Sequence, residues 1–96
     1  MKISKSHAVT GILLEDPEFR FTPWGKAVCI MLVNVDEDHQ YWQAWDLLAE
    51  ECAEHLQRNM LVDLTGTSKT QKWTDRNGKN HERDIYTASI VTWPDL

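Results

Sequence analysis

The sequence predicts an all-β fold, a five-stranded Greek-key barrel of the OB type with one α-helix between its third and fourth strands. Three observations lead to this prediction. Several short segments alternate apolar and polar residues, only one segment has the period of a helix, and glycines interrupt two of the strands, as a strand curving around a small barrel requires. A generic α+β sandwich is the alternative, and it accounts for the element order less economically.

Length and composition limit the number of domains and the class of protein. Ninety-six residues allow one domain, spanning residues 1–96. With 42% hydrophobic and 26% charged residues, the composition is that of an ordinary soluble globular protein. The longest apolar run, Ala27–Val33, is too short to cross a bilayer, so we expect no membrane span. The N-terminal segment lacks the apolar centre of a secretory signal, which predicts a cytoplasmic protein.

The first half of the chain has the pattern of strands separated by polar turns. Gly11 lies in the middle of the first alternating segment, where it indicates a bend or a close backbone approach. Pro17 fixes its own φ and marks a turn after that strand. The strands predicted from this pattern are residues 6–14, 26–35 and 41–45, with a short alternating segment at residues 19–22 and an acidic connector over residues 36–40.

The second half begins with the helical pattern. Leu48, Cys52 and Leu56 recur every four residues beside a polar, glutamate-rich face, which predicts an amphipathic helix of about three turns. Asp46 is the expected N-cap, and Asn59 the expected left-handed residue at the C-terminal end. The remaining predicted elements are a strand over residues 60–71 with Gly66 as a second bend, a hairpin, and a last strand over residues 84–93.

The stretch Lys69–Arg83 concentrates positive charge around Trp73. It nets +3, whereas the whole chain nets -5. The pair Asn77-Gly78 between two strand-compatible arms predicts a β-hairpin, because both residue types tolerate φ > 0. An exposed aromatic ring beside cations suits a single nucleic-acid strand, since bases stack on the ring while the cations contact phosphates. A structural interpretation stays open, in which the ring packs on its cross-strand neighbour and the basic residues only solubilise an edge.

The remaining side chains argue against a metal site or an enzyme. Cys29 and Cys52 are far apart in sequence and are expected to be buried free thiols. The four histidines are not at metal-ligand spacing, so we predict no metal and no other cofactor. No nucleophile stands beside a base and no glycine-rich phosphate loop precedes a helix, which predicts a protein that is not an enzyme. The net charge of -5 argues against coating of duplex nucleic acid by bulk electrostatics, so we expect any nucleic-acid site to be local.

Four segments also carry a resemblance to a known family: residues 11–23, residues 25–28, the helix residues Leu48–Glu50 with Leu56, and residues 69–78. They resemble the opening strands, the helix and the hairpin of bacterial single-stranded DNA-binding proteins, and the likeness runs from about Val9 to Val91. The resemblance implies an OB fold and sequence-tolerant binding of single-stranded DNA in replication, recombination or repair. It also implies a homodimer or homotetramer, which we expect to join through residues 6–14 because an open sheet edge needs cover.

The resemblance assigns binding residues as well. Trp73 matches the hairpin tryptophan on which a base stacks, and Trp42 matches the aromatic residue that opens the family's third strand. Lys69, Lys72 and Arg76 are then phosphate contacts. Three further candidates complete the predicted site: Lys79, Arg20, and Trp24, which is either an added stacking platform or a lid on the core.

The sequence also departs from the family's pattern. Asp36–Gln40 replaces a long arm that often carries another stacking aromatic, and its acidity repels phosphate. Trp45 is the substitute for a second missing aromatic, although it lies on the strand face opposite to Trp42. The acidic tail that recruits replication proteins is expected to be absent. This short, tailless build is similar to the primosomal replication protein N family, which predicts the alternative function of a protein-interaction subunit with weak nucleic-acid binding. Both DNA and RNA remain open as ligands, because stacking does not read the 2′-hydroxyl.

Overall fold

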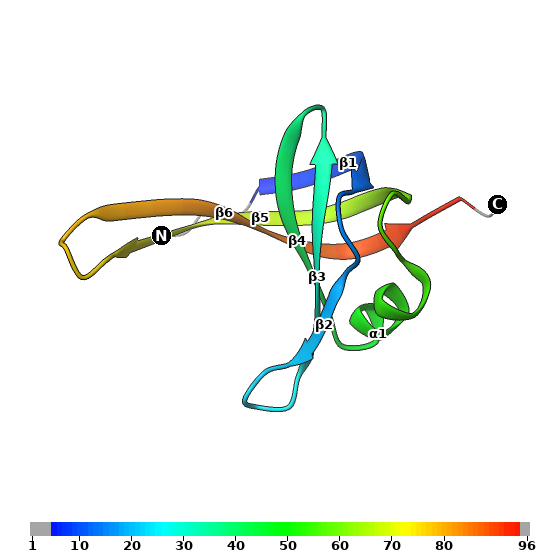
Figure 1. Ribbon diagram of the computed structural model, residues 1–96, viewed down its shortest axis with the longest axis horizontal. Coiled ribbons are helices and arrows are strands. Elements are labelled where there is room, and N and C mark those ends of the chain that lie inside the picture. The colour runs from blue at the N-terminus through cyan, green and yellow to red at the C-terminus, as the bar shows by residue number, and fades with distance from the viewer. Residues whose placement is uncertain (1–4, 95–96) are drawn as a thin grey trace.

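The computed structural model describes residues 5–94, which form six strands and one helix (Figure 1). Residues 1–4 and 95–96, which include part of the N-terminal segment discussed above, lie outside the described residues. The elements are β1 Lys5–Leu13, β2 Glu18–Phe21, β3 Ala27–Val35, β4 Asp38–Trp45, α1 Asp46–His55, β5 Leu61–Thr74 and β6 Asn80–Thr92.

The strands close into a barrel, which confirms the predicted OB fold. The sheet order is β1-β5-β6-β4-β3-β2, and β1 also pairs with β3 through Ile12 and Leu13. The pairing of β4 with β6 is parallel, with Trp42 opposite Tyr86. Because the short β2 is hydrogen-bonded as a strand of its own, the helix follows the fourth strand in this count.

The two glycines inside strands lie where the barrel bends. A Cβ on Gly11 would come within 2.6 Å of the backbone oxygen of Asn34, so β1 approaches β3 more closely than a side chain permits. Gly66 lies at a register shift between β5 and β6, and a Cβ there would collide with the carbonyl group of Thr87. The sequence prediction of bends at Gly11 and Gly66 is therefore confirmed.

The core lies between the barrel and the helix. Its largest fully buried side chains include Trp42, Leu13, Met31 and Leu64. Helix α1 adds Ala49 and Cys52, and its C-terminal neighbour Leu56 is also buried. Cys29 and Cys52 are free and buried, as predicted. The helix has ten residues, and no helix within residues 5–94 is long and apolar enough to cross a membrane.

Two local predictions differ from the structure. The acidic connector is a tight turn, because β3 and β4 extend to Val35 and Asp38 and only Asp36 and Glu37 lie between them, with φ of 48° and 67°. Asp46 is not the N-cap: Trp45 holds that position without a side-chain hydrogen bond, and Asp46 has a φ of 57°.

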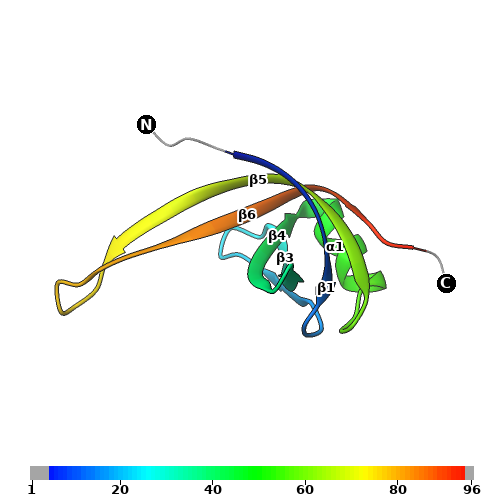
Figure 2. The ribbon, with the colours of Figure 1, turned by 90° about the horizontal axis from the view of Figure 1, so that it is seen from above.

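Strands β5 and β6 extend beyond the barrel as a long two-stranded arm (Figure 2). Their register runs from Asp63 opposite Thr92 to Thr74 opposite Asn80. The predicted hairpin is therefore confirmed, and its arms are continuous with the barrel strands. We call the part from Lys69 to Arg83 the hairpin arm.

Candidate nucleic-acid interface

Asp75 organises the tip of the hairpin arm. Its backbone N–H donates to the carbonyl of Lys79 at 3.0 Å, and its own carbonyl accepts from the N–H of Gly78 at 3.1 Å. Its carboxylate accepts from the backbone N–H groups of Asn77 at 2.9 Å and Lys79 at 3.0 Å. Gly78 has a φ of 77°, whereas Asn77 is not left-handed. The turn therefore uses one left-handed residue instead of the two that the Asn-Gly pair predicted.

Trp73 is supported on one side and open on another. It lies opposite His81 in the ladder, and the two rings stack with centroids 5.3 Å apart and planes inclined by 18°. The Nε2 of His81 lies 2.7 Å from Oδ2 of Asp75, which accepts a hydrogen bond from it. The guanidinium of Arg83 lies 5.7 Å from the centre of the indole. The ring nevertheless keeps 43% of its surface exposed, so cross-strand packing and an accessible aromatic occur together.

The electrostatics of the tip follow from these contacts. The hydrogen bond from His81 lowers the pKa of the Asp75 carboxyl below its ordinary value, and the backbone N–H groups of Lys79 and Asn77 lower it further. Asp75 is therefore a carboxylate at neutral pH. The carboxylate holds the turn through the backbone N–H groups and holds the imidazole of His81 through a hydrogen bond. The His81 ring is the surface on which the indole of Trp73 stacks.

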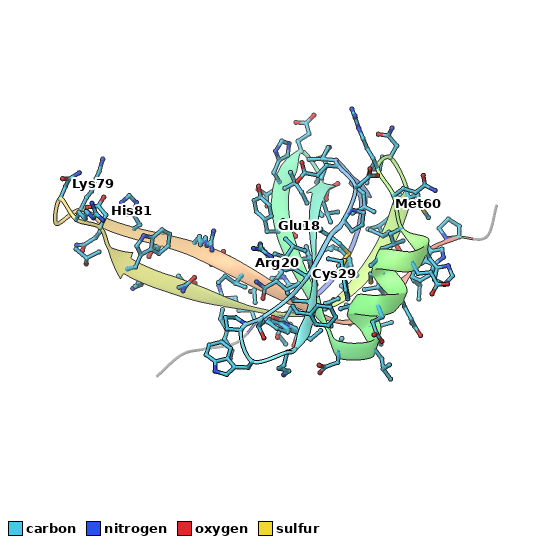
Figure 3. All side chains as sticks on the ribbon, turned by 60° about the horizontal axis from the view of Figure 1, so that its bottom comes forward. Glu18, Arg20, Cys29, Met60, Lys79 and His81 are labelled. Carbon is cyan, nitrogen blue, oxygen red and sulfur yellow. The ribbon has the colours of Figure 1, made fainter. Side chains whose placement is uncertain are left out.

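The predicted cations divide between the two faces of the arm. Along β5 the buried residues are even-numbered up to Ser68, so Lys69 and Trp73 point to the outer face and Lys72 to the opposite one. Arg83 pairs with Gln71 and therefore shares the outer face with the indole. Arg76 and Lys79 lie in the turn, where Lys79 and His81 mark the end of the arm in Figure 3. Lys69 and Arg83 are thus the cations on the face of Trp73.

A groove continues this outer face onto the barrel. It encloses about 530 Å³ between β2, β4 and β6. Arg20 and Arg83 line it from two sides, and Tyr41, with 54% of its surface exposed, lies between them. Arg20 also forms an exposed ion pair with Glu18 at 3.6 Å, and both side chains are labelled beside β2 in Figure 3. Acidic residues share the groove with these cations: Glu18, Asp38 and Asp84.

The prediction that Trp42 is a stacking platform is wrong. Its side chain has no exposed surface. The ring stacks on Tyr86 inside the barrel at 5.0 Å between centroids, and its Nε1 donates to Gln40 at 3.0 Å. A base cannot reach this ring, because the face of β4 that carries Trp42 and Ala44 forms the core.

The opposite face of β4 presents Tyr41, which the sequence analysis did not place in the site, and Trp45, which it offered as a substitute aromatic. Tyr41 lines the groove, and Trp45 is half-buried with the Lys26 ammonium 5.5 Å from its ring centre. The alternation of the sequence already separated these two from Trp42. Trp24 is 87% exposed in the turn between β2 and β3, so it does not act as a lid on the core.

Within residues 5–94 the structure contains no group of three or more His, Cys, Asp or Glu side chains able to hold a metal ion. The candidate interface described above is made of aromatic rings, cations and carboxylates on a sheet surface.

Two comparisons with known proteins both indicate similarity to single-strand binding proteins. The model of the single-strand binding protein family matches residues 5–92. The single-stranded DNA-binding protein 2 of Streptomyces coelicolor is 34% identical over 97 aligned residues, which cover 85% of this chain and 48% of that protein. The chain thus spans about half the length of the curated relative that it matches.

Proposed function

Because this chain belongs to the single-strand binding protein family, we propose that it binds single-stranded DNA without sequence preference, through base stacking on Trp73 and phosphate contacts from neighbouring cations. The observation that carries the proposal is the half-exposed indole with Lys69 and Arg83 on its face of the sheet. The proposed role is that of a non-catalytic, cytoplasmic factor in DNA replication, recombination or repair.

The proposed path of the strand runs along the outer face of the hairpin arm and into the groove on the barrel. Arg83 borders both surfaces, so it connects them. In the groove Tyr41 offers a second ring and Arg20 a second cation. Arg76 and Lys79 extend positive charge around the turn, and Lys72 reaches phosphates only where the strand wraps to the other face.

We propose further that the protein assembles into a homodimer or homotetramer through β1. Residues Lys5–Gly11 pair with β5 on one side, and within the described residues no other strand pairs with them. A second copy of β1 would cover this open edge. Light scattering at micromolar protein is expected to give a dimeric or tetrameric mass, and a monomeric mass would contradict the proposal.

A fluorescence titration tests the binding proposal. Oligothymidylate added at low salt is expected to quench tryptophan emission, and the quenching should fade as salt rises. Three phosphate contacts, from Lys69, Arg83 and Arg20, give a slope of log K against log salt of roughly -2. An oligouridylate of equal length, titrated in parallel, decides between DNA and RNA.

The acidic side of the groove favours the second candidate function, a protein-interaction subunit with weak nucleic-acid binding. Glu18, Asp38 and Asp84 repel phosphate beside the cations that would attract it. Such a subunit would bind other replication proteins, and tryptophans are common anchors at protein interfaces. Absence of quenching at low salt would support this function and reject the first.

A further inference from the structure

Among residues 5–94, strand β2 has one backbone edge with which no other strand pairs. It is the last strand in the sheet order, it pairs with β3, and all four of its residues are exposed. The N–H of Thr22 donates to the carbonyl of Lys26, so these two residues form a hydrogen-bonded pair at the end of the β2–β3 ladder. Hydrogen-bonded pairs in an antiparallel ladder recur every second residue, so Arg20 and Glu18 bond to β3. The N–H and C=O groups of Phe19 and Phe21 consequently point away from β3, toward open space.

The side chains of Phe19 and Phe21 make this edge apolar. They contact each other edge to face, with centroids 5.3 Å apart and planes at 82°. Phe21 keeps 63% of its surface exposed and Phe19 37%. Both lie on the core side of the sheet, because they pair with the buried Ala27 and Cys29, yet the core does not cover them. An exposed pair of aromatic rings on a free edge marks a place for another chain.

The helix beside this edge is strongly acidic. Helix α1 contacts β2 and carries four carboxylates and no Lys or Arg. His55 stacks on Trp93, so that flank of the helix faces the end of β6. The Asp16 carboxylate accepts from the backbone N–H of Arg58, which places the segment leading into β2 beside the C-terminal end of the helix. The flank opposite His55 therefore borders β2, and by helical spacing it carries Glu50, whereas the Glu54 carboxylate lies 3.8 Å from the His55 imidazole.

We propose that the edge of β2 is a docking site for an extended, basic segment of another protein, which adds as a strand next to Phe19 and Phe21. Backbone groups of such a segment would pair with the free N–H and C=O groups, and its alternate apolar side chains would cover the two rings. Its Lys or Arg side chains would face Glu50. The same carboxylate repels phosphate, so this surface is distinct from the proposed DNA path on the hairpin arm.

A designed peptide provides the probe: an acetylated, amidated octapeptide of alternating lysine and valine, followed by amide NMR of the full chain. Shifts are expected at Glu18–Phe21 and on α1, with slowed hydrogen exchange at the Phe19 and Phe21 amides. The same peptide with N-methylated valines keeps the charge and loses backbone donors, so it should bind at least tenfold more weakly. Equal binding of both peptides, no binding of either, or shifts confined to the hairpin arm would overturn the proposal.

Two variants of the protein sharpen the test. Phe21→Pro removes one ring and one edge N–H that β3 does not use, and proline is tolerated on edge strands, so binding should fall about tenfold in a folded protein. Ile90→Thr, which removes a comparably exposed side chain from β6, is the matched control and should bind normally. The Glu50→Lys variant should bind the lysine peptide more weakly and a glutamate-valine peptide more tightly. Unchanged preference in that variant, or loss of a dimer in Phe21→Pro, would show that no basic partner uses this edge.

Discussion

Trp73 rests on His81 across the hairpin arm, with 5.3 Å between ring centroids and 18° between planes. The imidazole is itself held by Asp75 at 2.7 Å. This chain of contacts restrains the indole in the absence of a ligand, which would lower the entropy lost in the proposed stacking of a base. The ring keeps 43% of its surface exposed for that proposed contact.

Trp73→Ala is expected to weaken binding of single-stranded DNA about tenfold to a hundredfold, because one stacking platform contributes roughly 1 to 3 kcal/mol. Fluorescence anisotropy of a labelled oligonucleotide measures the change. Trp73→Phe, which keeps a ring, should retain most of the affinity. Unaltered affinity in the alanine variant would remove Trp73 from the site.

Trp42→Ala is expected to act on stability. A fully buried tryptophan leaves a large cavity, so the free energy of unfolding should fall by about 3 to 5 kcal/mol. Trp24→Ala, in an exposed turn, is the control and should change it by less than about 0.5 kcal/mol. Urea unfolding measures both. A stable Trp42→Ala protein with impaired DNA binding would restore Trp42 as a contact residue.

The Asp75 carboxyl should add an acid-dependent contribution to stability. Its pKa is lowered from 3.8 in the folded protein, chiefly by the hydrogen bond from His81. A lowered pKa means that the contribution is present above the unfolded value and is lost as pH falls through the folded value. Asp75→Asn keeps an acceptor for the turn and lacks the charge. At neutral pH the free energy of unfolding of the wild type should exceed that of this variant, and in acid the difference should vanish. A difference in the free energy of unfolding that does not depend on pH would contradict the assignment.

Gly66→Ala is expected to destabilise the barrel by about 3 kcal/mol, because the Cβ meets backbone atoms of Thr87 and Ala88 that no rotamer change can move. Gly25→Ala provides the comparison. Gly25 has a φ of 82° in open space, so only backbone strain opposes the substitution, at about 1 kcal/mol. Thermal unfolding of the two variants should rank them in this order, and the reverse order would show that the bulge accommodates a side chain.

The two thiols should be unreactive in the folded protein. Burial raises the pKa of Cys29 from 9.0 to about 11 and that of Cys52 from 9.0 to about 12. Because these pKa values are raised, the contribution of the buried thiols to the free energy of unfolding is complete below pH 9.0. That contribution is lost as pH rises through the pKa values of the folded protein. Modification by a disulfide reagent at pH 8 should proceed readily in urea and slowly without it. Rapid modification of the native protein would show that the core opens.

The sequence predicted the barrel well because its signals are local. Alternation located the strands, and Gly11 and Gly66 identified the bends, since each needs only the residues around it. The OB order then followed from the single helix. The turn at Asp36 and Glu37 was missed because two acidic residues with positive φ give no turn signal as strong as Asn-Gly.

The site was harder to predict because it depends on register and on which sheet face is buried. Alternation separated Trp42 from Tyr41 and Trp45, yet it did not say which face the core occupies. Likewise Arg83 is far from Trp73 in sequence order along the hairpin, and only the pairing of β5 with β6 brings its guanidinium to the indole. The family resemblance assigned Trp42 to the site from its position in the sequence, but the side chain is packed in the core and cannot contact a base.

The basic hairpin arm and the acidic helix project from different sides of the barrel (Figure 1). This separation gives the molecule a permanent electric dipole moment despite its net negative charge of -5. A polyanion approaching through solution exerts a torque on such a dipole and rotates the positive end toward itself before contact. Under the proposed function this rotation favours productive collisions, and added electrolyte should slow the association rate by weakening that torque.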